Sequence, residues 1–172
     1  MVRQIVVTEY NPEWVSMFEA EAELVWQILG KNCIAVHHIG STSVPGLAAK
    51  PIIDILPVVY DIGQVDTVKA DFEKIGYEYL GEFGIAGRRF LSKGGDQRSH
   101  HIHIFSEDHL GEIERHLAFR DYLRTHREAR EEYARLKRML AQKFPFDNEG
   151  YCDGKDEFVK KLEKEALAFF RG

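Results

Sequence analysis

Asp54 is the residue whose surroundings in the sequence most clearly indicate chemistry. It interrupts an apolar run at residues 52–59. Such a run predicts a buried, central β-strand. An acid inside a buried strand costs free energy unless it is paired, hydrogen-bonded or bound to a metal. We therefore expect Asp54 to be a catalytic residue and a metal ligand.

A turn of small residues, Gly40, Ser41 and Thr42, follows the preceding apolar strand. Glycine lets a ligand approach the backbone closely. Hydroxyl and backbone N–H groups in a turn that opens towards a helix start form a plausible cradle for phosphate. Lys50 lies four residues before Asp54 and adds a positive charge, although an exposed Lys50 is the alternative. We expect these four residues to bind phosphate or nucleotide.

His101 and His103 are the second unusual feature, within a predicted strand at residues 100–105. Residues at positions i and i+2 of a strand share one face. Two histidines at this spacing can bind one metal, and histidine suits transition metals. If this strand lies beside Asp54, the three side chains form a metal site. The alternative is that both histidines hydrogen-bond to loops and ligands without a metal.

Arg88 and Arg89 stand in a short predicted strand before these histidines. A guanidinium group matches the geometry of phosphate oxygens. We expect this pair to supply a phosphate-binding clamp. Consecutive strand residues point to opposite faces, so one of the two side chains, and not both, can reach a common site.

The remaining pattern combines strands and helices. Helical spacing of apolar residues, with caps at the ends, predicts a helix from Asn11 to Gly30 and another from about Asp61 to Gly76. An edge strand is expected at residues 3–8, and the chain from about residue 108 is expected to be helical, with a last helix capped by Asp153. The charged runs in these C-terminal helices are expected to be solvated faces.

Composition limits the class of protein. The 172 residues carry a net charge of −5, which argues against general nucleic-acid binding, and no RNA-binding aromatic motif occurs. No apolar run approaches the length needed to span a membrane. Cys33 and Cys152 fit no metal or redox motif, so we expect reduced thiols in a cytoplasmic protein. The sequence leaves the oligomeric state open.

Three motifs together resemble the GrpB family, a branch of the nucleotidyltransferase superfamily. They are HIGSTSVPGLAAKPIIDI at residues 38–55, GRRF at residues 87–90 and HHIHIF at residues 100–105. The resemblance runs from Tyr10 to about Lys161. It implies an α+β fold, with a nucleotidyltransferase-like mixed β-sheet flanked by helices and a helical C-terminal part, as a single domain over residues 1–172.

The resemblance also implies a function. Active members of the superfamily bind a nucleoside triphosphate, with Gly-Ser on the phosphates and carboxylates on Mg²⁺. Asp54 matches the first acid of the usual Asp-x-Asp pair, but Leu56 stands at the second position. A histidine in place of the third acid would shift the preference from Mg²⁺ towards Mn²⁺ or Zn²⁺. We expect Mg²⁺ or Mn²⁺ as the cofactor, ahead of Zn²⁺.

Three functions follow from these observations. The first is metal-dependent binding of a nucleoside triphosphate or a phosphorylated small molecule, with transfer of a nucleotidyl group to a small acceptor if the protein is an enzyme. The second is a catalytically inactive binding or regulatory module. For this module, a ligand related to coenzyme A is suggested, because some members of the GrpB family are fused to dephospho-coenzyme A kinase. The third is a hydrolase that uses a metal bound by histidine and aspartate.

Overall fold

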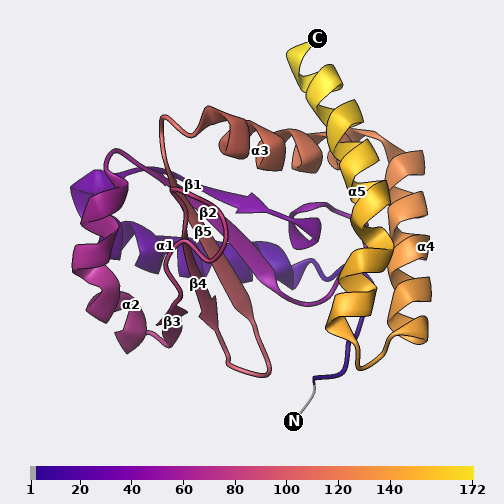
Figure 1. The fold of residues 1–172 in the computed structure, drawn as a ribbon, viewed down its shortest axis with the longest axis horizontal. Helices are drawn as coiled ribbons and strands as arrows, with labels where there is room; N and C mark the ends of the chain where they lie inside the picture. Colours follow the sequence, from indigo (N-terminus) through magenta and orange to yellow (C-terminus); the bar gives the residue numbers. More distant parts are fainter. Residues whose placement is uncertain (1–2) are drawn as a thin grey trace.

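A five-stranded mixed sheet forms the centre of the molecule (Figure 1). The computed structural model describes residues 3–172. The strand order is β1-β2-β5-β4-β3; β2 and β5 are parallel, and the other neighbouring pairs are antiparallel. The strands are β1 (Cys33–Ile39), β2 (Ile53–Val59), β3 (Tyr77–Tyr79), β4 (Arg89–Lys93) and β5 (His100–Ser106).

Helices flank the sheet on both faces, and two of them stand beside it (Figure 1). They are α1 (Glu13–Leu29), α2 (Lys69–Lys74), α3 (Leu110–Thr125), α4 (Arg127–Lys143) and α5 (Asn148–Arg171). Short 3-10 turns lie at η1 (Gly30–Asn32), η2 (Ser41–Ser43) and η3 (Ile62–Val68). The helical C-terminal part thus begins at Leu110, close to the predicted position. Each helix within residues 3–172 is too short or too polar to span a lipid bilayer.

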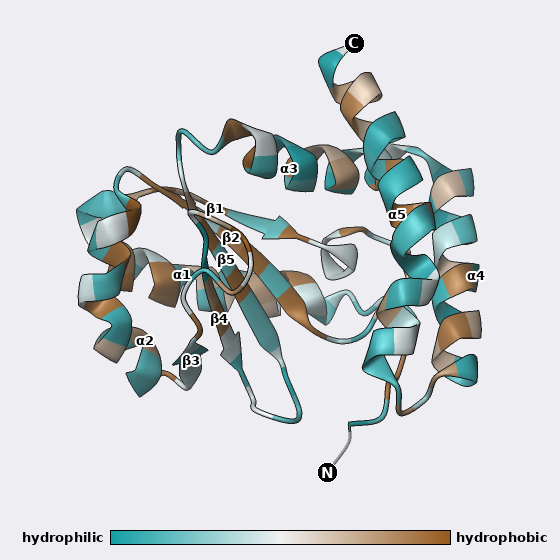
Figure 2. Cartoon of the chain, viewed as in Figure 1, coloured by the Kyte–Doolittle hydropathy of each residue, from teal (hydrophilic) through white to brown (hydrophobic). Residues whose placement is uncertain are grey.

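Strand β2 is apolar because both of its faces are covered. Ile53 and Ile55 are fully buried in the cluster that contains Trp14 of α1. Leu56, on the other face, is fully buried in a cluster with Ile113 of α3. Figure 2 shows hydrophobic segments concentrated in the central strands, and mostly hydrophilic colour on α3, α4 and α5. The prediction of a central strand is therefore confirmed.

The segment between β1 and β2 is held against the C-terminal helices. Val44 and Leu47 are fully buried in one cluster with Leu123 of α3, Tyr133 of α4 and Leu162 of α5. Since this segment also contains the Gly40–Ser43 turn, its packing fixes that turn relative to α4.

The helix predicted from about Asp61 to Gly76 is confirmed only in part, because its first half is the 3-10 helix η3 and only α2 is α-helical. Two further local predictions are wrong. The expected cap Asp153 lies inside α5, because Asp147 accepts a hydrogen bond of 3.0 Å from the Gly150 N–H and starts the helix earlier. Residues 3–8 form one isolated bridge, between Thr8 and Ala49, and no strand. The Ile5 N–H instead donates to the carbonyl of Pro145 at 2.7 Å, which ties this segment to the turn between α4 and α5.

Candidate functional site

Asp54, His101 and His103 lie together on one face of the sheet. The parallel register of β2 and β5 places Asp54 directly beside His101. Asp54 Oδ1 is 3.5 Å from His101 Nδ1 and 3.2 Å from His103 Nε2. One ligand atom from each of the three side chains lies within 4.8 Å of the other two, a spacing that suits a metal ion. The two strands thus bring together residues that are far apart in the sequence.

The Asp54 carboxyl group is held in its ionised form. Burial by itself raises its pKa, but hydrogen bonds and electrostatic attraction from the His101 and His103 rings outweigh burial, so its pKa lies well below the usual value. The neighbouring His38 is neutral, because burial lowers its pKa to about 4. A fixed anion thus faces the space between β2 and α4.

Gly40 is required where the backbone passes over Asp54. Its φ of +71° lies in the left-handed region. A Cβ atom at this position would lie 2.6 Å from Asp54 Oδ2, well inside van der Waals contact. The absence of a side chain therefore leaves one oxygen of Asp54 accessible beside the turn.

The hydroxyl groups of the turn have different roles. Thr42 is almost fully buried, and its hydroxyl donates to the Ile52 carbonyl and contacts His38 Nε2 at 3.0 Å. The Ser43 hydroxyl donates to the Gly40 carbonyl at 2.5 Å. Ser41 Oγ instead accepts a hydrogen bond of 2.9 Å from Lys137 Nζ. Of the three hydroxyls, that of Ser41 is the one bonded to a lysine side chain.

Lys137 is a site residue that the sequence analysis missed. It lies on α4, where the charged run was expected to be solvated, yet it is 2% exposed. Burial lowers the pKa of its ammonium group far below the usual value, and nearby positive charges lower it further. A signal was present, because Lys137 follows Tyr133 by four residues and precedes Leu140 by three. It therefore lies on the buried stripe of the helix.

Lys50, Lys137 and Lys155 line one cavity of about 190 Å³, opposite Asp54 and His101. Within residues 3–172, none of the three lysines forms an ion pair with a carboxylate. Burial, together with the charge of Lys155, lowers the pKa of Lys50 to about 8. Such a cluster of cations without counter-charges is suited to an anionic ligand.

Tyr151 of α5 adds a polar group to this cavity. Its side chain is fully buried, and its hydroxyl has no hydrogen-bond partner among the described residues. Lys50 and Lys155 lie 4.7 and 5.1 Å from the centre of its ring, so cation–π attraction partly stabilises both charges. Sequence reasoning assigned Tyr151 no function. Buried hydroxyls usually have a partner, so this one is available to a ligand.

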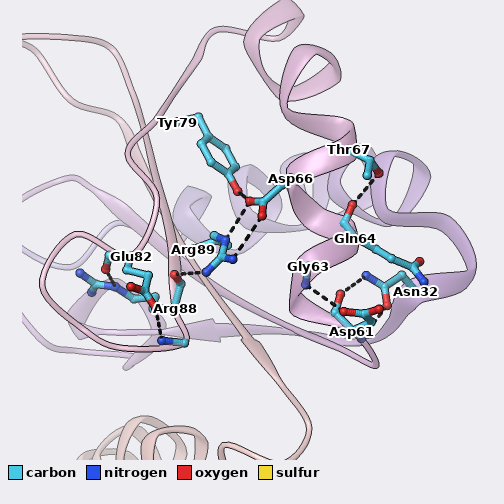
Figure 3. Close-up of polar contacts among 11 residues, drawn as sticks. Asn32, Asp61, Gly63, Gln64, Asp66, Thr67, Tyr79, Glu82, Arg88 and Arg89 are labelled. Atoms are coloured by element: carbon cyan, nitrogen blue, oxygen red, sulfur yellow. Dashed lines mark hydrogen bonds and ion pairs between the residues drawn. The ribbon is translucent and has the colours of Figure 1, made fainter.

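The two arginines point in different directions, as the alternation along a strand requires. Arg89 bonds to Asp66 at 2.8 and 3.2 Å, away from Asp54, and Tyr79 donates to the same carboxylate (Figure 3). Arg88 donates to the carbonyls of Glu82 and Phe83, and its Nη1 lies 3.4 Å from His103 Nδ1. Arg88 is therefore adjacent to the site, whereas Arg89 is not.

Leu56 lies two residues after Asp54, at the position that the sequence resemblance compares with a second acid. The side chain is fully buried in a cluster with Ile39, Phe105 and Ile113. A carboxylate at this position would be buried among apolar groups beneath α3. The packing of α3 on the sheet thus accounts for the apolar residue here.

The fold is nucleotidyltransferase-like. The structure of the Cid1 poly(U) polymerase in its MgGTP-bound form matches with a TM-score of 0.52. It is 18% identical in sequence, and the match covers 79% of this chain and 44% of the Cid1 chain. This likeness shows the fold alone. Together with the mixed sheet, it confirms the predicted fold class.

The particular family follows from closer relatives. A profile described as GrpB protein matches residues 4–165. The UPF0157 protein YqkA of Bacillus subtilis (strain 168) is 44% identical over 170 residues, covering 99% of this chain and 49% of YqkA. The crystal structure of the conserved protein GrpB from Enterococcus faecalis is 54% identical, has a TM-score of 0.95, and is matched over 97% of this chain and 100% of that chain. The chain belongs to the GrpB family and spans about half the length of YqkA.

One more distant relative has an enzyme name. A dephospho-CoA kinase of Mycolicibacterium paratuberculosis (strain ATCC BAA-968 / K-10) is 24% identical over 181 residues. The match covers 91% of this chain and 44% of that kinase.

Replacing Gly40 by alanine is expected to destabilise the protein more than the same change at Gly30. Both glycines combine positive φ with strongly negative ψ, so both variants carry a backbone cost of about 1–3 kcal/mol. Gly30 has no atom within 4 Å of the added Cβ, whereas Gly40 has Asp54. Urea denaturation should give an additional loss of at least about 1 kcal/mol for Gly40→Ala. Equal losses in the two variants would contradict the close approach of Gly40 to Asp54.

Proposed function

We propose that this chain binds a nucleoside triphosphate, or another phosphorylated small molecule, together with a divalent metal ion. The observation that carries the proposal is the cavity in which Lys50, Lys137 and Lys155 face Asp54 and His101. In this proposal the phosphates lie on the backbone of Gly40 and Thr42, on the Ser41 hydroxyl and on the three lysines. The turn and the lysines supply hydrogen-bond donors and charge on two sides of the cavity.

The metal is proposed to bind Asp54, His101 and His103. The three ligand atoms lie close enough to share one ion, and Gly40 keeps the adjacent oxygen of Asp54 accessible. One carboxylate and two imidazoles suit Mn²⁺ or Zn²⁺ better than Mg²⁺, which prefers oxygen ligands. A metal bound here would neutralise phosphate charge and polarise a phosphoryl oxygen. Arg88 is proposed to orient His103 and to face the ligand, and we leave Arg89 out because Asp66 holds it.

Two functions are compatible with this binding site. As an enzyme, the protein would transfer a nucleotidyl group to a small acceptor and release pyrophosphate, with Lys137 and Ser41 orienting the phosphates. As a binding module, it would hold the ligand without chemistry. The burial of Leu56 at the second acid position favours the module, and the similarity to a dephospho-CoA kinase supports testing coenzyme A precursors as ligands. A reducing compartment such as the cytoplasm is part of the proposal, since both cysteines are free and Cys33 is buried.

Binding should depend on both the metal and Asp54. Calorimetry with the four nucleoside triphosphates and with coenzyme A precursors, each with Mn²⁺ or Mg²⁺, is expected to give metal-dependent binding to the unmodified protein. Asp54→Ala should abolish that dependence, while Asp71→Ala, an exposed acid on α2, should not change it. If none of these ligands binds with either metal, the proposal is contradicted. An assay for pyrophosphate release from the ligand that binds would then distinguish the two functions, because only an enzyme would release pyrophosphate.

Lys137 should contribute to binding at the expense of stability. Lys137→Met keeps the size of the side chain and removes a buried amine that has no carboxylate partner. We therefore expect an unfolding free energy that is unchanged or about 1 kcal/mol higher in urea denaturation. Triphosphate affinity should fall about tenfold or more, because the hydrogen bond that Lys137 Nζ would donate to a phosphate oxygen is lost. Lys161→Gln, a side chain 78% exposed on α5, is the control. A variant that is less stable but binds normally would show that Lys137 has a structural role.

Affinity for phosphate should decrease as the pH rises through the pKa of Lys50. This pKa is lowered to about 8, so the ammonium group is charged at pH 7 and largely neutral at pH 9. An anionic ligand binds the charged form, so binding measured by calorimetry should weaken over this range. Lys50→Arg remains charged throughout and should flatten the profile. An identical pH profile for the two proteins would exclude Lys50 from the binding site.

A further inference from the structure

A second and larger cavity adjoins the lysine cavity. Its volume is about 760 Å³, within the range of pockets for small molecules. Lys50 and Ile52 line both cavities, so the two share a wall. Pro51 lies between these two residues, and the remaining lining residues come from three further segments: residues 3–6, residues 96–98 and Phe146. Figure 1 shows the N-terminal segment, the β4–β5 hairpin and the turn between α4 and α5 at the same end of the molecule.

Backbone contacts hold these segments in place. The Ile5 N–H donates to the Pro145 carbonyl at 2.7 Å, next to Phe146. Thr8 and Ala49 exchange two backbone hydrogen bonds of 2.9 and 3.0 Å. Three walls of the cavity are therefore connected to one another before any ligand binds.

The lining combines unpaired cations with exposed apolar groups. Arg3, Lys50 and Arg98 line the cavity, against one acid, Asp96. In the part of the chain that the structure describes, none of these three cations has an ion pair. Arg98 Nη1 lies 3.4 Å from His101 Nε2, so one cation stands between the two cavities.

An aromatic ring and an aliphatic side chain form the apolar side. Phe146 is 58% exposed and Val6 is 48% exposed, beside Pro51 and Ile52. Large apolar side chains this exposed, gathered in a concave surface with cations, are typical of a binding site for an organic anion.

We infer that this cavity binds a small organic anion, a phosphomonoester or carboxylate with a planar apolar portion. The anionic group lies between Arg3 and Arg98, and the planar portion packs on Phe146. This inference deepens the proposed function and rests on it for one point: the organic anion is the acceptor, or second ligand, bound next to the phosphates. Its binding in the cavity is testable by itself.

The test uses simple probes that separate the two parts of the ligand. Ligand-observed NMR titrations of the whole protein with phenyl phosphate, benzoate, inorganic phosphate and phenol should rank the first two as tighter binders. Phenyl phosphate is expected to bind about tenfold more tightly than either inorganic phosphate or phenol. Comparing the affinities for phenyl phosphate and benzoate then shows whether the cavity prefers a phosphomonoester or a carboxylate.

Two variants locate the binding. Phe146→Ala and Arg3→Gln should each lower the affinity for phenyl phosphate several-fold. Phe169→Ala, whose ring is 57% exposed on α5, and Arg127→Gln, whose side chain is 81% exposed on α4, are the matched controls and should bind normally.

The failure of this inference is distinguishable from that of the proposed function. Asp54→Ala and Lys137→Met, which test the lysine and metal site, should still bind phenyl phosphate more tightly than inorganic phosphate, because the contact with Phe146 remains. The opposite result would be a Lys137→Met variant that no longer binds phenyl phosphate, while Phe146→Ala and Arg3→Gln bind it normally. This result would place the anion in the lysine cavity and overturn the inference. Equal affinity for phenyl phosphate and inorganic phosphate would overturn it as well.

Discussion

The parallel pairing of β2 with β5 is the constraint on which the candidate site depends. It places Asp54 beside His101 and within 3.2 Å of His103, and these two rings keep an acid ionised on an otherwise apolar strand. A shift of one residue in this register would turn the histidines towards the opposite face, where α1 packs. The apolar residues of β2 therefore determine the position of the polar site, because they fix the register.

The opposite side of the cavity depends on the packing of three helices. Val44 and Leu47 bury themselves against α3, α4 and α5, and this contact brings Lys137 to Ser41. The resulting cavity has one carboxylate on the sheet, Lys137 and Lys155 on α4 and α5, and Lys50 in the segment that leads into β2. Burial, and to a lesser extent the neighbouring positive charges, lowers the pKa of Lys50 and of Lys137. A bound phosphate would supply the counter-charge that these lysines lack, which is the physical basis for expecting an anion here.

Much of the sheet side was predictable from the sequence. Asp54 and the histidine pair were visible as violations of apolar strands, and the glycine before them as a turn. The alternation of side chains predicted that one arginine of the pair would reach the site, but not which. Lys137, Lys155 and Tyr151 were not predicted, because their role depends on how α4 and α5 pack against a turn about one hundred residues earlier in the chain. Local helical periodicity cannot report such a contact, although it marked Lys137 as part of a buried stripe. The cap of α5 was misplaced for a simpler reason: Asp147 and Asp153 are both suitable caps, and the turn that ends α4 favours the first.

The central claim is that metal and phosphate meet between the sheet and α4. A crystal structure determined with Mn²⁺ and a nucleoside triphosphate, with diffraction data collected at a wavelength where manganese scatters anomalously, tests it most directly. We expect an anomalous peak between Asp54, His101 and His103, with phosphate density on the Gly40–Ser43 turn and Lys137. An anomalous peak elsewhere, or phosphate density that contacts neither the turn nor Lys137, would contradict the account.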